Sequence, residues 1–396
     1  MTNVFLKPGR VKPVFAGHPW VFSGAIERVE GTPAPGEAVD VRDPKGNLVG
    51  RGFYSPSSQI RVRMVTWDPD EALDDALLSR LLAAAVSLRV RTLSLDLAAD
   101  ACRLVHGEGD GLPGLIVDLY PPFCVVQLNG AGVEIRRETI LAALRSALPG
   151  LTGILERSEA WARKEEGLEY REGPLWGEAP PALHKIRENG VEHLADLARG
   201  QKTGFYLDQR ENRRRFASFL KGARLLDAFA YTGAFSREAV LLGGAREAVC
   251  VESGKKALEI LEAGRAADPA IPIRVEAGDF EKVAALLKEG GERFDAVVLD
   301  PPPLARSGAD IQRALSHYAE IHRRALPLLA PGGLLLSCCC SQRIGPEDFR
   351  RVLAHVAREQ KREARVLDLW RESPDHPSRA PCEESGYLKA FLLRVD

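Results

Sequence analysis

The sequence predicts an α/β protein whose C-terminal half is a doubly wound, Rossmann-like domain that follows two smaller domains. Strand-like runs with turn signals fill the chain up to about Thr66, a mixed helix and strand pattern follows to about Gly190, and a strict alternation of strands and helices begins near Asp208. The 396 residues also exceed one domain of about 100–200 residues. We therefore expect domains at 1–68, 69–190 and 191–396.

Composition narrows the class of protein. Hydrophobic residues make up 45% and charged residues 28%, which is typical of a globular chain. The N-terminus lacks the apolar run of a signal peptide, and no segment approaches the roughly 20 apolar residues of a membrane span, so we expect a cytoplasmic protein. Seven cysteines without a Cys-x-x-Cys pair indicate neither a disulfide framework nor a zinc site. The net charge of −1 means that any nucleic-acid binding must use local basic surfaces.

The first 68 residues predict a small β-rich domain. The runs 37–42 and 59–65 alternate apolar and polar side chains, as half-buried strands do, and turn signals at 31–36 and 43–46 separate the runs. The middle domain is predicted to be α+β. Its elements are a helix with apolar positions from Leu77 to Leu88, strands near Leu104, 115–119 and 125–128, and a helix over 138–148.

One glycine motif in the middle domain resembles a nucleotide-binding loop but does not fit one. Gly109-Asp-Gly-Leu-Pro-Gly114 leads into a strand-like run and not into a helix, so it predicts a β-hairpin. Glu108 and Asp110 suggest a metal loop, yet the remaining ligands are missing. We therefore expect no metal.

The last domain is predicted to contain a parallel sheet with helices on both faces. Its strands are expected at 224–229, 248–252, 273–277, 295–300 and 334–338, followed by 366–370 and 387–395. Ligands in such a sheet bind outside the carboxyl ends of the strands.

Acidic residues stand at the ends of the first three strands. The loop after Asp227 has one glycine, Gly233, where a dinucleotide fingerprint needs three, so a dehydrogenase is disfavoured. Asp227 suits the ammonium of a methionine moiety, Glu252 the ribose hydroxyls, and Asp279 with Phe280 the adenine. Each carboxylate alone fits a helix N-cap equally well, but their common register favours an S-adenosyl-L-methionine site.

The fourth and fifth strands end in residues suited to methyl transfer onto carbon. Asp300 is followed by three prolines, and Pro303 replaces the aromatic residue expected of amine methyltransferases. Carbon 5 of a pyrimidine becomes nucleophilic only after a thiolate adds to carbon 6. Cys338 and Cys340 are expected to share one face of the strand, with Cys339 on the other. We favour Cys340, which is nearest the loop, as the nucleophile.

These residues, together with 201–210 and the tail motif Gly386-Tyr-Leu-Lys389, resemble the RlmI-like family of 23S ribosomal RNA cytosine-5 methyltransferases. The likeness covers the whole chain, and 7–22 are similar to the family's PUA domain. The resemblance implies a PUA domain for RNA, a central α+β domain, a class I methyltransferase domain that uses S-adenosyl-L-methionine, large-subunit ribosomal RNA as the partner, no membrane association, and a homodimer. The run of three cysteines departs from the one that the family pattern contains.

The resemblance also implies a set of site residues. Cys340 and Asp300 are assigned to catalysis, with Asp300 facing a flipped cytosine and also closing the cofactor site. The remaining cofactor-binding positions form an upstream wall, the methionine end, the ribose contact and the adenine contact. They are, in that order, Gln201, Thr203, Phe205, Asp208, Gln209 and Arg210; Asp227, Phe229, Tyr231, Gly233 and Phe235; Glu252 and Ser253; Asp279 and Phe280.

Other interpretations remain open at this stage. The chain also fits an RNA uracil-5 or purine methyltransferase, and an RNA-binding relative that has lost its activity. A dehydrogenase comes third. Four arginines near the start of the last domain form either a phosphate-binding patch or a solvated helix face; they are Arg210, Arg213, Arg214 and Arg215.

Overall fold

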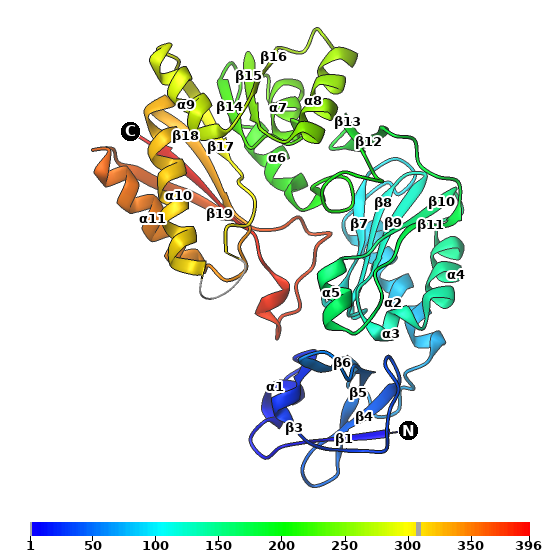
Figure 1. Ribbon diagram of the computed structural model, residues 1–396. Coiled ribbons are helices and arrows are strands. Elements are labelled where there is room, and N and C mark those ends of the chain that lie inside the picture. The colour runs from blue at the N-terminus through cyan, green and yellow to red at the C-terminus, as the bar shows by residue number, and fades with distance from the viewer. Residues whose placement is uncertain (1, 306–309) are drawn as a thin grey trace. The chain divides into compact units, whose positions relative to one another are not determined.

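The computed structural model describes residues 2–305 and 310–396, which form two compact units (Figure 1). The first unit contains Met1–Ala182, Leu197–Thr203 and Pro374–Ser385, and the second contains Leu183–Asp196, Gly204–Ser373 and Gly386–Asp396. Among the described residues, no helix combines the length and the apolar composition that a membrane crossing requires.

The first unit begins with the predicted β-rich region, a six-stranded sheet with the order β2-β6-β5-β4-β1-β3. The predicted alternation is present in β6, where Val62 is buried between the partly exposed Arg61 and Arg63. In β4 it is incomplete, because Asp40 between Val39 and Val41 is also buried, in ion pairs with Arg42 and Arg51. A short helix, α1 (Val11–Phe15), lies between the first two strands in sequence. The strands are β1 (Thr2–Leu6), β2 (Trp20–Phe22), β3 (Ile26–Glu30), β4 (Ala38–Arg42), β5 (Leu48–Tyr54) and β6 (Ile60–Thr66).

The rest of the first unit is a five-stranded sheet, β11-β10-β9-β8-β7, with helices, as predicted. Asp74 begins the first helix by accepting a hydrogen bond from the backbone N–H of Leu77 (2.9 Å). The helices are α2 (Asp75–Ser87), α3 (Ala131–Glu134), α4 (Arg137–Ala147) and α5 (Ala160–Glu165). The strands are β7 (Cys102–His106), β8 (Leu115–Tyr120), β9 (Phe123–Leu128), β10 (Gly153–Arg157) and β11 (Glu172–Gly177).

The glycine motif lies in the predicted hairpin. β7 and β8 pair antiparallel on either side of it, and its acidic residues hold side chains of the same unit. Glu108 accepts from the Trp20 indole (2.9 Å), and Asp110 forms an ion pair with the buried Arg89 (2.6 Å). These carboxylates therefore have a structural use.

The second unit contains the predicted doubly wound domain, a seven-stranded sheet with the order β16-β15-β14-β17-β18-β20-β19. The pairs from β16 to β18 are parallel, and β20 runs antiparallel to both of its neighbours. The strands are β14 (Arg224–Ala228), β15 (Glu247–Glu252), β16 (Ile273–Ala277), β17 (Phe294–Leu299), β18 (Leu329–Cys339), β19 (Ala364–Trp370) and β20 (Lys389–Val395).

Helices cover both faces of this sheet (Figure 1). One core joins the sheet to α9, α10 and α11 through buried residues such as Phe280, Tyr318 and Phe349, and the other joins it to α6 and α7 through Phe216 and Phe235. The helices are α6 (Arg210–Ala217), α7 (Ala234–Leu241), α8 (Lys255–Ala267), α9 (Phe280–Glu289), α10 (Ile311–Ala325) and α11 (Pro346–Glu359).

Two elements are additional to the predicted ones. β11 is an edge strand, a position where Pro174 and two glycines are tolerated. A separate hairpin, β12 (His184–Glu188) and β13 (Val191–Ala195), precedes the doubly wound sheet and belongs to the second unit.

Candidate active site at the strand ends

The loop after β14 has an unusual backbone. Phe229, Tyr231 and Gly233 all have positive φ angles, of 63°, 51° and 75°. Non-glycine residues seldom adopt this conformation, and such residues cluster at functional sites. A Cβ atom at Gly233 would lie 2.5 Å from Leu261 Cδ1, so glycine is required for both reasons. The loop thus brings backbone close to the end of β14.

Asp227 lies at the end of β14 and is buried, with 1% of its surface exposed. Its Oδ2 accepts hydrogen bonds from the backbone N–H and the hydroxyl of Ser236, at 3.1 and 2.8 Å. Burial raises the pKa of Asp227 to about 7, against the lowering effect of these hydrogen bonds. The pKa of this carboxyl group therefore lies close to neutral pH.

Glu252 joins the end of β15 to the same loop. Its Oε2 accepts from the backbone N–H of Tyr231 (2.8 Å), and its Oε1 accepts from those of Ser253 (2.9 Å) and Gly254 (2.6 Å). The side chain is partly exposed, and Ser253 is exposed. The carboxylate is thus held at the strand end by three backbone donors.

The end of β16 combines a helix cap with a core aromatic. Asp279 is exposed and accepts from the backbone N–H of Glu281 (3.1 Å), which makes it the N-cap of α9. Phe280 is buried and its ring lies 5.3 Å from that of Phe229. Phe280 therefore has a packing role in the structure, whatever else it contacts.

Residues upstream of α6 divide between the units. Thr203 belongs to the first unit, as Gln201 does, and its hydroxyl donates to Asp118 (2.5 Å). In the second unit, Gln209 donates to the Asp300 carboxylate (2.9 Å). Phe205 and Arg210 are buried, and Asp208 accepts from the Tyr387 hydroxyl. Of these upstream residues, Gln209 is the one with a described hydrogen bond to Asp300.

Neither interpretation holds for all four arginines near the start of the last domain, because two of them are buried and two are exposed. Arg213 is 3% exposed and forms a bidentate ion pair with the buried Glu188 of β12, at 2.6 and 2.9 Å. Arg210 is also buried, and the exposed Arg214 pairs with Glu211 (2.7 Å). The sequence could not reveal this because the partner of Arg213 comes from a hairpin that the pattern did not predict.

The three cysteines occupy the two faces that the strand periodicity predicted. Cys339 packs in the core with α9 to α11, whereas Cys338 packs in the other core, and Cys340 is partly buried against that second core. Burial, followed by the nearby charge of Asp300, raises the pKa of the Cys338 thiol. Cys340 alone of the three is partly exposed, and its Sγ donates to the carbonyl of Pro301 (3.4 Å).

Ser341 connects the cysteine strand to the Asp300 loop. Its hydroxyl oxygen accepts from the backbone N–H groups of Leu304 (3.1 Å) and Ala305 (3.2 Å), and it lies 3.4 Å from the Tyr318 hydroxyl. The ends of β17 and β18 are therefore tied together.

Sequence reasoning missed two residues of this region. Burial and the charge of Asp300 raise the pKa of Tyr206, whose ring lies 5.2 Å from that of Tyr231. Lys389 is 3% exposed, and its Nζ donates to the carbonyl of Ser341 (2.7 Å). Both residues stand within motifs that carry the family resemblance, but no spacing rule connects them to Asp300 or the cysteines.

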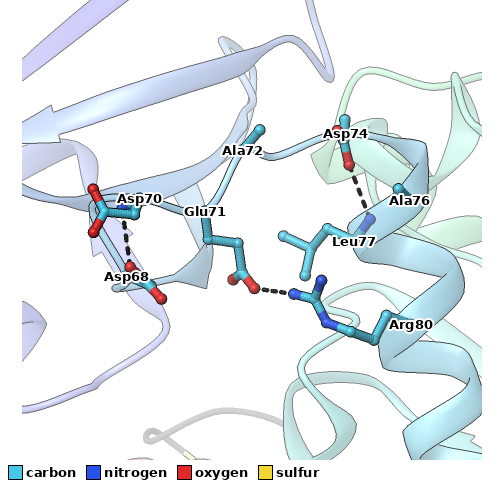
Figure 2. Close-up of a pocket in the computed structure, with 8 residues that line it drawn as sticks. All are labelled: Asp68, Asp70, Glu71, Ala72, Asp74, Ala76, Leu77 and Arg80. Carbon is cyan, nitrogen blue, oxygen red and sulfur yellow. Dashed lines mark hydrogen bonds and ion pairs between the residues drawn. The ribbon is translucent and has the colours of Figure 1, made fainter.

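A pocket in the first unit is a different kind of feature. Figure 2 shows it between the end of the β6 segment and the start of α2. Asp70 donates to Asp68 through its backbone, and Glu71 pairs with Arg80. Half of the eight lining residues are acidic and none is a predicted site residue, so we place the chemistry at the strand ends of the second unit.

Comparisons with known proteins identify the family of the chain. A PUA-like domain model matches residues 4–67, and an S-adenosylmethionine-dependent methyltransferase model matches 103–394. The chain is 38% identical over 395 residues to "Ribosomal RNA large subunit methyltransferase I" of Escherichia coli O9:H4 (strain HS), covering 99% of both proteins. The same name and identity apply to a protein of Klebsiella pneumoniae (strain 342), with 99% of this chain and 98% of the relative covered.

Two solved structures share the fold along the full length. A protein from Streptococcus mutans, described as a SAM-dependent methyltransferase, has a TM-score of 0.82 at 20% identity, with 100% of both chains covered. The structure of SMU.776 complexed with SAH has a TM-score of 0.84 at 21% identity, again with 100% of both chains covered.

Proposed function

We propose that this chain, which belongs to the S-adenosylmethionine-dependent methyltransferase family and to its ribosomal RNA large subunit methyltransferase I group, methylates carbon 5 of a cytosine in large-subunit ribosomal RNA. The ribosomal substrate follows the name of the relatives, and the PUA-like domain suits an RNA partner. The choice of carbon 5 rests on the thiol chemistry of this chain.

S-adenosyl-L-methionine is the cofactor and supplies an electrophilic methyl group. The chain's own residues fit it: the buried Asp227 suits an ammonium, and Glu252 is held at the next strand end where ribose hydroxyls can donate to it. The positive-φ loop leaves backbone near the same place. We assign the methionine end to the loop residues, the ribose to Glu252 and Ser253, and the adenine to Asp279 with Phe280. The upstream wall remains Gln201, Thr203, Phe205, Asp208, Gln209 and Arg210.

One observation carries the proposal for carbon 5. Cys340 is a partly exposed thiol at the end of β18, and it contacts the loop of Asp300 through the Pro301 carbonyl at 3.4 Å. Gln209, from a segment far before Asp300 in the sequence, donates a hydrogen bond to the Asp300 carboxylate. A nucleophile and a carboxyl group are therefore held at neighbouring strand ends, which an amine methyltransferase does not need.

The proposed reaction balances in four steps. The Cys340 thiolate forms a bond to carbon 6 of the cytosine, and a proton on ring nitrogen 3, placed by Asp300, offsets the developing charge. Carbon 5 then forms its bond to the methyl group as the bond from that group to the donor's sulfonium sulfur breaks, which leaves S-adenosylhomocysteine. A general base removes the proton from carbon 5, the sulfur–carbon 6 bond breaks to release the thiolate, and the proton on ring nitrogen 3 returns to Asp300. In this scheme Asp300 positions the cytosine, and Cys340 adds to carbon 6 and is released again at the end.

Trapping with a fluorinated base tests this function. RNA that carries 5-fluorocytosine has no removable proton on carbon 5, so wild type and Cys339→Ala are expected to form a covalent complex after methylation, and Cys340→Ala is not. Denaturing gels with labelled RNA measure the complex. Trapping that persists in Cys340→Ala and vanishes in Cys338→Ala would assign the other sulfur. No trapping in any variant, with cofactor bound, would argue against carbon 5.

Two properties of the whole protein are proposed on the resemblance. We infer three domains, at 1–68, 69–190 and 191–396, and a homodimer. Sedimentation of the full chain measures the oligomeric state, and a monomer at micromolar concentration would contradict the homodimer.

A further inference from the structure

Lys389 is a buried cation whose ammonium donates hydrogen bonds to backbone carbonyls. It begins β20, lies opposite Cys339 in the antiparallel ladder, and is 3% exposed. Its Nζ donates to the carbonyl oxygens of Ser341 and Tyr387, both at 2.7 Å. In the part of the chain that the structure describes, no carboxylate forms an ion pair with this Nζ. Burying an ammonium in this way is costly unless an opposite charge compensates it.

The groups around this lysine indicate where its charge acts. Burial lowers the pKa of Lys389, while the Cys339 and Cys340 thiols, followed by Glu372, act in the opposite direction and Arg371 adds to the lowering. The Oε1 atom of Glu372 is occupied by the backbone N–H groups of Tyr387 and Leu388. The two thiols are therefore the groups that act most strongly on the ammonium, ahead of Glu372.

Of these two thiols, Cys340 is the one that a substrate can reach. Cys339 is fully buried in the core, whereas Cys340 is partly exposed. Asp300, Tyr206 and Tyr318 also lie near Cys340 and present negative or neutral groups to it. A thiolate beside the Asp300 carboxylate is disfavoured unless a cation offsets that charge.

We propose that Lys389 is a positioning residue for the Cys340 thiolate. Its ammonium holds the carbonyl of Ser341, the residue directly after Cys340, and supplies the positive charge against which the thiol loses its proton to water. The Ser341 hydroxyl is held in turn by Leu304 and Ala305. The sulfur thus contacts the Asp300 loop through the Pro301 carbonyl, and the backbone directly after it is bonded to β20 through Lys389. This inference deepens the proposed function, since it rests on Cys340 being the nucleophile.

Alkylation of Cys340 measures thiolate formation without RNA or methyl transfer. Iodoacetamide reacts with the thiolate, so the rate of Cys340 modification, followed by peptide mass spectrometry from pH 6 to 10, gives the thiol's titration. We expect a midpoint below about 8.5 in wild type, the value of a free cysteine. Lys389→Met is expected to move the midpoint upward by about one unit, which slows modification at pH 7 about tenfold.

The controls separate charge from structure. Lys389→Arg keeps the cation and is expected to keep the wild-type profile, and Lys288→Met removes an exposed lysine of α9 and is expected to change nothing. S-adenosylhomocysteine binding by each variant reports that the fold is intact. A wild-type midpoint at or above 8.5, or matching profiles for wild type and a folded Lys389→Met, overturns the role of Lys389. A midpoint that shifts as far in Lys389→Arg as in Lys389→Met also overturns this role, because the arginine keeps the positive charge.

This test fails separately from that of the proposed function. A lysine-dependent titration of Cys340 without trapping of 5-fluorocytosine would keep the inference about Lys389 and remove the carbon 5 reaction. Trapping of 5-fluorocytosine together with a Cys340 titration that is the same in wild type and Lys389→Met would keep the carbon 5 reaction and remove the inference about Lys389.

Discussion

The strand ends of β14, β15 and β16 and those of β17 and β18 carry similar polar residues, but hold them in different ways. In the first group, each carboxylate is fixed by donors a few residues along the chain or in the adjacent loop: Asp227 by Ser236, Asp279 by Glu281, Glu252 by Ser253 and Tyr231. In the second group, the contacts join distant segments, as Gln209 with Asp300, Leu304 with Ser341, and Lys389 with Ser341.

This difference suggests two separable functions along one edge of the sheet. Local donors pre-form the proposed methionine, ribose and adenine contacts at the first three strand ends. Long-range contacts assemble the thiol and the carboxyl group of the other two strands, so those residues depend on the whole second unit being folded. Substitutions at β14 to β16 should therefore change cofactor affinity and leave the reactivity of Cys340 unchanged, and substitutions at β17 and β18 should do the opposite.

The largest expected effect comes from Cys340. Replacing it with alanine removes the nucleophile, so transfer of labelled methyl groups to RNA is expected to fall by at least about a thousandfold. Calorimetric affinity for S-adenosylhomocysteine should stay within twofold of wild type. A Cys340→Ala variant that retains a tenth of the activity would contradict both the nucleophile and the division of the edge.

Glu252→Ala tests the opposite half. Removing the carboxylate deletes the proposed ribose contact and frees the backbone N–H of Tyr231, and hydrogen bonds to charged groups contribute about 1.5–3 kcal/mol. We expect S-adenosylhomocysteine to bind about 10–100-fold more weakly, with Cys340 alkylation unchanged. Glu252→Gln keeps an acceptor for Tyr231 and should lose less affinity. An unchanged dissociation constant for the alanine variant would remove the ribose assignment.

The pH dependence of cofactor binding should follow Asp227. Burial raises its pKa to about 7, so the free protein carries a neutral carboxylic acid below that pH and a carboxylate above it. Since only the carboxylate attracts the ligand's ammonium, affinity for S-adenosylhomocysteine should rise about tenfold from pH 6 to pH 8 and then level off. Asp227→Asn can still accept from Ser236 but should give a flat profile. A wild-type profile that is flat or falls would refute the ammonium contact.

Sequence reasoning reached features that local rules determine. The strand and helix order, the hairpin at Gly109–Gly114 and the two faces of the Cys338–Cys340 run follow from periodicity and turn residues, and the structure confirms them. The family assignment is confirmed over nearly the whole chain.

The misses involve contacts between segments far apart in sequence. Arg213 looked like part of an exposed basic stripe, yet it is buried because Glu188 approaches it from a hairpin that lies before it in the chain. Lys389 and Tyr206 have no pattern of their own, since their place beside the thiol and Asp300 depends on the order of the strands. Ion pairs and buried polar contacts of this kind need the tertiary structure.

The smallest expected effect concerns Asp279, where a structural and a functional role can be separated with one pair of variants. Serine is as good an N-cap as aspartate, so Asp279→Ser should keep the free energy of unfolding within a few tenths of a kcal/mol, whereas Asp279→Ala should lose about 1 kcal/mol. If Asp279 also accepts a hydrogen bond from the adenine amino group, both variants lose that contact and should bind S-adenosylhomocysteine about fivefold more weakly. Urea unfolding and calorimetry measure the two quantities independently. Wild-type affinity in Asp279→Ser would show that the residue only caps α9, and the cofactor site would then end at Glu252.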